Sequence, residues 1–150
     1  NKDSWIYSNS SHVIDLFRFF AGEIKNSHSF VGSFFRKNGD QFSSIIKFNN
    51  GILGNFIANW YSPSGWSVCL HGEKIMVQFK PLEKGIWIDK KFVKHIIKSN
   101  ERDKKYKPGF YNQMLAFKKM LKTKKVNWPI QDLNSSLKTF SLVRSINNGK

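Results

Sequence analysis

The spacing of apolar residues near the start of the chain predicts a helix over residues 12–21. Its apolar positions recur at the interval of one helical face and are Val13, Leu16, Phe17 and Phe20. Ser10 or Ser11 can cap the first turn, and Gly22 is a natural stop after the last one.

The pattern then changes to short β-branched and aromatic runs separated by turn residues, which predict strands. These runs cover residues 30–35, 42–48, 52–61, 66–71, 75–79, 86–88 and 92–97. The sequence Asn49-Asn50-Gly51 predicts a hairpin, because Asn-Gly tolerates positive φ at both central turn positions. Strands with such short connections indicate a largely antiparallel, meandering sheet.

The last third of the chain returns to helical spacing. Residues 99–107 read as a charged connector, and a second helix opens after Pro108-Gly109 with an apolar face formed by Phe110, Met114, Phe117 and Leu121. A third helix is expected near Asp132, with Leu133, Leu137 and Phe140 on one side. This order predicts one α+β domain over residues 1–150, an open-faced, largely antiparallel sheet with helices packed on one face.

Helices on one face leave the other face of the sheet open. On the strand over residues 52–61, one face carries Ile52, Phe56, Ala58 and Trp60, and the other carries Leu53, Asn55, Ile57, Asn59 and Tyr61. The second face is too apolar to be simply exposed to solvent, so we expect it to contact a partner domain or a second copy of the chain. Contact with a second copy would form a homo-oligomer. Coverage by the chain's own loops is the alternative.

Charge and cysteine content narrow the function classes. The chain of 150 residues has a formal net charge of +15, which favours anionic partners. Nearly all of that charge is Lys, whereas base reading relies on Arg, so a lysine-rich solvated surface is favoured over a specific nucleic-acid site. One cysteine indicates a reducing, cytoplasmic location, and no apolar run approaches the ~20 residues of a membrane span.

The sequence contains no Gly-rich phosphate loop, so a nucleotide site built by this chain alone is not expected. Metal ligation is not expected either, because no histidine pairs with another histidine, a cysteine or a carboxylate at a recognised spacing. Cys69, in mid-strand among apolar neighbours, is expected in the core rather than as a nucleophile.

His12 is the strongest candidate for chemistry. The electropositive first turn of a helix would keep its imidazole neutral near pH 7, able to accept a proton from a substrate hydroxyl. Asp15, three residues on, could orient that ring or favour the helix start. The alternative is that His12 is an ordinary first-turn residue bonded to backbone.

The stretch from Ser11 to Glu23 resembles the "sHxxDllrxllG" segment of the Gfo/Idh/MocA oxidoreductases, named for glucose-fructose oxidoreductase and inositol dehydrogenase. Further segments follow the same family's order over nearly the whole chain: 48–54 resembles its hairpin, the Trp60 region a strand end, 71–74 a turn and 109–117 a helix.

This resemblance implies a nucleotide-binding Rossmann domain for NAD or NADP, followed by an open-faced sheet domain that holds a sugar, polyol or related substrate. The family's nucleotide loop and Glu-Lys-Pro lysine are not in this sequence, so the chain is expected to be the second domain only, and inactive alone. The family's catalytic histidine matches His12. Many members carry Asp four residues earlier, where this chain has Ser8, which leaves the proton relay open.

The expected substrate contacts are Tyr7, Ser8, Asn9, Asp15 and Trp60. The resulting hypothesis is the substrate-binding half of an NAD(P)-dependent oxidoreductase. Two alternatives stay open: a basic nucleic-acid-binding module, and a family member without catalysis that serves binding or assembly.

Overall fold

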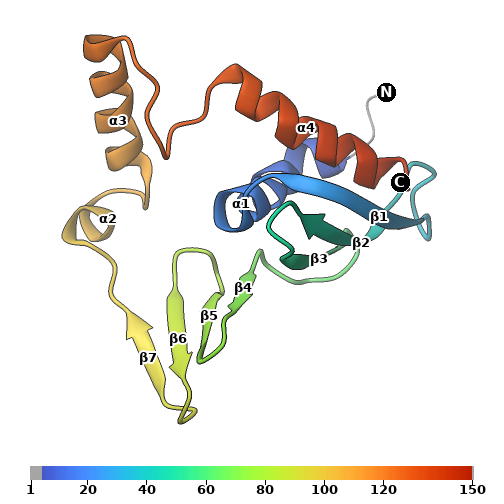
Figure 1. Cartoon of the computed structure of the whole chain (residues 1–150). Helices are drawn as coiled ribbons and strands as arrows, with labels where there is room; N and C mark the ends of the chain where they lie inside the picture. The colour runs from blue at the N-terminus through green and yellow to red at the C-terminus, as the bar shows by residue number, and fades with distance from the viewer. Residues whose placement is uncertain (1–4, 150) are drawn as a thin grey trace. The chain divides into compact units, whose positions relative to one another are not determined.

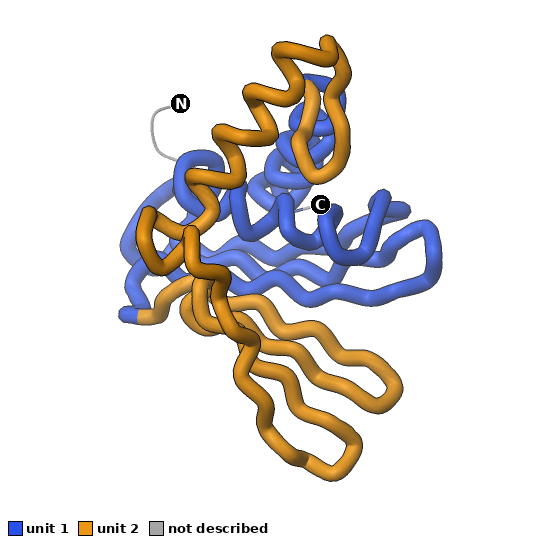
Figure 2. Tube along the Cα trace, turned by 90° about the vertical axis from the view of Figure 1, so that its left-hand side faces the viewer, with its two compact units in different colours: residues 1–63, 133–150 blue, residues 64–132 orange. Residues whose placement is uncertain are grey.

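The computed structural model describes residues 5–149, and the chain divides into two compact units. Unit 1 comprises residues 1–63 and 133–150, and unit 2 comprises residues 64–132 (Figure 2). Each unit contains one antiparallel sheet, three-stranded in unit 1 and four-stranded in unit 2. The predicted α+β class with an open sheet is confirmed, although the sequence pattern did not indicate that the strands divide into two sheets.

Unit 1 begins with a π-helical turn, η1 (Ile6–Ser10), and continues into α1 (Ser11–Ala21). Its strands are β1 (Ile24–Gly32), β2 (Gln41–Phe48) and β3 (Leu53–Asn59), and α4 (Leu133–Asn147) closes the unit. The helices α1 and α4 lie over one face of the β1-β2-β3 sheet (Figure 1).

Unit 2 contains the meander β4 (Val68–His71), β5 (Ile75–Phe79), β6 (Gly85–Asp89) and β7 (Lys94–Ile97). Two helices follow, α2 (Glu101–Lys105) and α3 (Phe110–Thr123). The expected connector 99–107 therefore contains a helical turn. Asn100 caps this turn by accepting a hydrogen bond from the backbone N–H of Asp103 at 2.9 Å.

The buried apolar side chains of the described residues all belong to unit 1. They are Trp5, Ile6, Ile14, Phe42, Ile46, Phe48, Phe56, Leu142, Val143 and Ile146. In unit 2 the large apolar residues that α3 exposes range from 42% exposed at Leu115 to 62% at Met114, and none of its residues is buried. Burial of apolar surface therefore stabilises unit 1 much more than unit 2.

The first strand starts earlier than predicted and ends before residues 33–35. Serines occupy its helix-facing positions: Ser29 donates to Ser44 at 2.9 Å, and Ser27 lies 3.2 Å from Ser145 of α4. Because these buried positions are polar, hydrophobic alternation does not mark the strand. The predicted hairpin at Asn49-Asn50-Gly51 is confirmed, but only Gly51 has positive φ, at 87°.

The predicted apolar face of α4 is wrong, and that of α1 is right at Phe17 but wrong at Phe20. On α4 the buried positions are Thr139, Leu142, Val143 and Ile146, whereas Leu133, Leu137 and Phe140 are 72%, 61% and 46% exposed. On α1 the face toward the core consists of Ile14, Phe17 and Ala21, and Phe20 is 39% exposed. Gly22 ends α1 as expected, with φ of 84° and its N–H bonded to the Arg18 carbonyl.

The contact between α1 and α4 depends on Arg18, whose side chain is only 7% exposed. One guanidinium nitrogen donates to the Ser135 carbonyl at 2.6 Å and to the Thr139 hydroxyl at 2.8 Å. The other donates to the Glu23 carboxylate at 2.8 Å. A charged group outside the predicted apolar face thus selects the side of α1 that faces α4.

The second face of the β1-β2-β3 sheet is open, as the strand pattern predicted. Ser43 on β2 is paired with Phe30 on β1 and with Ile57 on β3, so these three residues form one row across the sheet. Lys47 on β2 is paired with Leu53 on β3. Phe30, Ile45, Leu53 and Ile57 are 66%, 57%, 67% and 69% exposed. We call these four residues the open apolar face.

We expect Arg18→Ala to lower the free energy of unfolding by roughly 2–3 kcal/mol, because hydrogen bonds to a buried charged donor are lost. The matched control is Lys138→Ala, since Lys138 reaches the same Glu23 carboxylate at 3.3 Å but is 59% exposed. That exposed pair is worth about 0–1 kcal/mol. Urea unfolding followed by circular dichroism measures both, and equal effects would contradict the role given to Arg18.

Candidate functional site

Three of the predicted substrate residues, Tyr7, Ser8 and Asn9, lie on the π-helical turn η1. The turn is anchored by Ile6 and Ser10, which are buried, and it runs directly into α1. Short π-helical turns are rare and frequently mark functional sites. Three residues that the sequence suggested as substrate contacts therefore lie on a rare type of backbone turn.

Tyr7 lines a hollow of about 590 Å³ within unit 1. The other lining residues are Val31, Ser33, Lys37, Asn38, Gly39, Arg144, Asn147 and Asn148. Two cationic side chains, several amides and one aromatic ring suit a ligand with hydroxyl or anionic groups. The hollow is therefore the candidate ligand site of this unit.

The loop between β1 and β2 that bears Lys37 and Asn38 is held by Asp40, a buried residue. Its carboxylate accepts hydrogen bonds from the backbone N–H groups of Phe34, Phe35 and Arg36. Burial acts to raise the pKa of Asp40, but these N–H donors outweigh it and hold the pKa below its ordinary value. The same bonds turn residues 33–36 out of the strand, which is why β1 ends at Gly32.

His12 is exposed near the start of α1, outside the lining of the hollow. The expected bare helix N-terminus at this position is wrong, because helical backbone already runs from Ile6 to Ser10 in front of it. Ser10 makes no side-chain capping bond. The dipole argument for a neutral imidazole therefore loses its basis, while the accessibility of the ring to a ligand remains.

Asp15 faces α4. Its carboxylate accepts a hydrogen bond from the Thr139 hydroxyl at 2.5 Å and lies 3.9 Å from the Arg18 guanidinium. These contacts give Asp15 a part in the joint between α1 and α4. Ser8 is exposed, and its hydroxyl donates to the Trp5 carbonyl at 3.3 Å.

Trp60 belongs to an aromatic cluster at the end of β3. Its ring centroid lies 5.5 Å from that of the buried Trp5, and the Arg36 guanidinium carbon lies 4.2 Å above its ring. The side chain is still 46% exposed. The structure thus groups Trp60 with Arg36, whereas Tyr7 lies in the hollow and His12 and Asp15 lie on α1.

Sequence reasoning missed Lys37, Asn38 and the α4 residues that share the hollow with Tyr7. Arg144 and Asn147 come from the far end of the chain, and no local motif links them to residue 7. A usable signal was the scarcity of arginine, since Arg144 is one of the few arginines in a lysine-rich chain.

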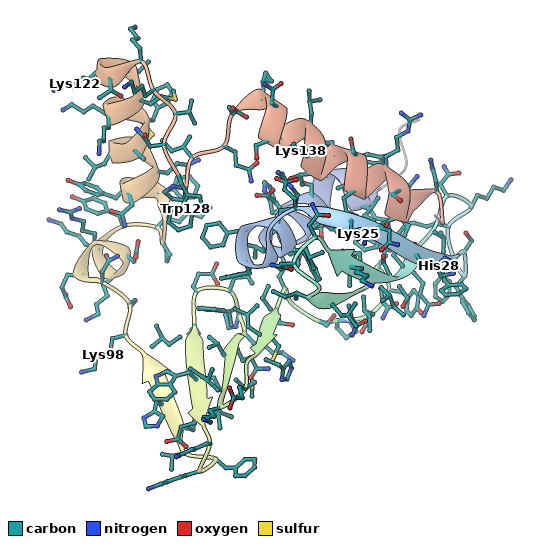
Figure 3. The ribbon with its side chains drawn as sticks, viewed as in Figure 1. Lys25, His28, Lys98, Lys122, Trp128 and Lys138 are labelled. Carbon is teal, nitrogen blue, oxygen red and sulfur yellow. The ribbon has the colours of Figure 1, made fainter. Side chains whose placement is uncertain are left out.

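Lysines are spread over both units, as shown by Lys25 on β1, Lys138 on α4, Lys122 on α3 and Lys98 after β7 (Figure 3). A second hollow, of about 650 Å³ in unit 2, has Lys80, Lys84, Lys94, Lys98 and Lys104 in its lining. Glu83 and Glu101 also line it, and no aromatic side chain does. This composition does not favour a base-stacking nucleic-acid surface.

Cys69 is exposed, so its expected place in the core is wrong. Across residues 5–149, no three side chains among His, Cys, Asp and Glu gather as a metal site. None of the helices described is long and apolar enough to cross a membrane.

A scan against protein-family models matched residues 3–78 to the GFO/IDH/MocA C-terminal domain. The matched range includes all the predicted site residues, from Tyr7 to Trp60. A comparison with curated proteins found no match.

Solved structures share the fold at low identity. UDP-N-acetylglucosamine 3-dehydrogenase from Acidithiobacillus ferrooxidans gives a TM-score of 0.77 at 10% identity, over 93% of this chain and 44% of that one. Aldose-aldose oxidoreductase from Caulobacter crescentus, complexed with glycerol, gives 0.77 at 14%, over 93% and 43%. The WlbA dehydrogenase from Bordetella pertussis, with NADH and UDP-GlcNAcA, gives 0.64 at 15%, over 93% and 43%. The chain spans less than half the length of these proteins.

We expect Asp40→Asn to destabilise the chain at neutral pH, because an amide replaces the carboxylate that accepts hydrogen bonds from three backbone N–H groups. A depressed native pKa contributes stability that is present above the unfolded value of about 3.9 and is lost as pH falls through the native pKa. The difference in Tm between the variant and the unaltered protein should therefore be largest above pH 5 and shrink below pH 4. A difference independent of pH would show that the charge of Asp40 is not what stabilises the loop.

Proposed function

We propose that this chain, which belongs to the GFO/IDH/MocA family, is the substrate-binding half of an NAD(P)-dependent oxidoreductase acting on a sugar, polyol or related hydroxy compound. The observation that carries the proposal is the π-helical turn with Tyr7, Ser8 and Asn9, which lies inside the family match and directly precedes His12.

The hollow beside this turn supports a polyhydroxylated ligand. Amide side chains such as Asn38 and Asn147 can both donate to and accept from hydroxyl groups, and Lys37 and Arg144 can bind an anionic substituent. Tyr7 offers an apolar ring face together with a phenolic hydroxyl. The solved relatives with glycerol and with UDP-GlcNAcA bind ligands rich in hydroxyl groups, which agrees with this class.

His12 is proposed to take a proton from the reacting substrate hydroxyl, or to return it in the opposite direction. The imidazole is exposed on α1 and can approach a ligand. Asp15 is assigned a positioning part only, because its carboxylate contacts Thr139 and Arg18 and fixes the position of α1. Ser8 cannot act as a carboxylate partner for the histidine.

The described residues do not fit a dinucleotide site. All paired strands in both sheets are antiparallel, so they do not form the parallel β-strand–helix–β-strand unit whose helix N-terminus holds a pyrophosphate. We propose that NAD or NADP is bound mainly by a separate Rossmann domain of the full-length enzyme, in the cytoplasm.

The open apolar face is proposed to pair with a second copy of the chain. Phe30, Ile45 and Ile57 are exposed on the same face of neighbouring strands, and an isologous contact would bury them in both copies.

In the full-length enzyme, we expect His12→Ala to lower kcat by roughly 10²–10⁴-fold, the usual range for a positioned general acid or base. His12→Asn should be nearly as damaging, because an amide can hydrogen-bond the hydroxyl but cannot accept its proton. Steady-state turnover of reduced nicotinamide across a panel of sugars and polyols measures both variants. Near-normal kcat in His12→Ala, with unchanged circular dichroism, would remove His12 from the reaction.

We expect the chain to sediment as a dimer or larger species at micromolar concentration, and Ile57→Lys to weaken that association at least tenfold. A lysine on the open apolar face would place an unpaired charge in the interface. The matched control is Leu137→Lys, because Leu137 is similarly exposed, at 61%, but lies on α4. A monomer at all concentrations, or equal effects of the two lysines, would contradict the proposed interface.

A further inference from the structure

Three soft metal-ligand side chains meet on one face of the β4–β5 hairpin. Cys69 and His71 lie two residues apart on β4, so their side chains point to the same side of the sheet. Met76 on β5 is paired directly with His71 across the ladder. This cluster lies in unit 2 and has no part in the proposed oxidoreductase site.

The Cys69 sulfur lies close to the donor atoms of the other two side chains. The thiol sulfur of Cys69 lies 3.4 Å from Nε2 of His71 and 3.2 Å from the thioether sulfur of Met76. With metal–ligand bonds of about 2.0–2.3 Å, one ion bound to all three would see angles of about 100° between sulfur and nitrogen and about 90° between the sulfurs. Both angles are compatible with one ion that is bound to Cys69 and to its two neighbours.

The chemistry of the donors selects the class of ion. Thiolate and thioether ligands favour soft Cu(I), and imidazole also suits copper. Hard cations prefer oxygen donors, and these three side chains provide none. Because the third ligand is a thioether, the cluster differs from zinc sites built from cysteine, histidine and carboxylate.

The hairpin holds these donors on a fixed frame that is open to solvent. The short turn is closed by the Gly72 N–H, which donates to the Ile75 carbonyl at 2.8 Å. Met76 belongs to β5, which pairs with β4 on one side and with β6 on the other. Cys69 and His71 are exposed, so an ion can reach them without opening the sheet.

We propose that Cys69, His71 and Met76 form a binding site for one monovalent soft metal ion, Cu(I). On binding, the Cys69 thiol releases its proton to solvent and its sulfur bonds to the metal, while neutral His71 and Met76 donate lone pairs. The oxidation state of copper does not change in this step.

The test uses the whole chain with Cu(I), supplied without oxygen from a coloured Cu(I)–chelator complex. We expect one equivalent to transfer to the protein and the colour to fade accordingly. Met76→Leu, which keeps the shape but removes the thioether, should weaken binding by at least about tenfold. Cys69→Ser should weaken it further, and Met114→Leu, at a methionine 62% exposed on α3, should leave it unchanged.

A second measurement identifies the thioether directly. The chain contains three methionines, so labelling their methyl groups with ¹³C yields three resonances. One equivalent of Ag(I), a redox-inert ion of the same class, should shift the Met76 resonance and leave those of Met114 and Met120 in place. Unchanged Cu(I) affinity in Cys69→Ser or Met76→Leu, or an Ag(I) shift at Met114 or Met120 instead of Met76, would overturn the proposal.

Discussion

The guanidinium of Arg18 is the interaction on which the rest of unit 1 depends. It bonds α1 to Ser135 on α4, 117 residues later in the chain. A buried charge is costly unless it is paired and hydrogen-bonded, and here the Ser135 carbonyl, the Thr139 hydroxyl and the Glu23 carboxylate provide those partners. The same contact acts on Glu23, whose pKa is lowered chiefly by its hydrogen bond from Arg18. Once α4 is fixed in this way, Leu142, Val143 and Ile146 enter the core, and Arg144 and Asn147 reach the candidate ligand hollow.

This long-range contact explains which parts of the fold the sequence could predict. The strands of unit 2, the hairpin at Gly51 and the stop at Gly22 depend on local turn chemistry and on alternation, and the pattern places them well. The faces of α1 and α4 depend on a polar contact between distant helices, so hydrophobic spacing alone selected the wrong residues, such as Phe20 and Leu137. The end of β1 was missed for a similar reason. The N–H groups of residues 34–36 donate hydrogen bonds to the Asp40 carboxylate and not to a neighbouring strand.

The site hypothesis drawn from the sequence rests mainly on residues that lie close together in the chain. Tyr7, Ser8, Asn9 and His12 belong to one short segment, which was singled out by the helix start expected there and by its resemblance to the family segment. Lys37 and Arg144 lie beside Tyr7 only through tertiary structure, and no local motif in the sequence links these three positions. Asp15 is a different case. Its position near His12 suggested a partner for the imidazole, whereas its carboxylate lies against Thr139 and Arg18.

The open apolar face can be judged by the free energy that its burial would contribute. Phe30, Ile45, Leu53 and Ile57 are each between 57% and 69% exposed, so burying the rest of each side chain contributes about 1–2 kcal/mol. One copy of the face therefore contributes about 4–8 kcal/mol, which lies at the lower end of the ~4–15 kcal/mol that association costs in lost freedom. In an isologous dimer both copies are buried, and the contribution doubles to about 8–16 kcal/mol. Self-pairing thus raises the gain from the lower end of the range of the association cost to its middle and upper part, whereas contact with a polar partner surface would leave the gain at the lower end.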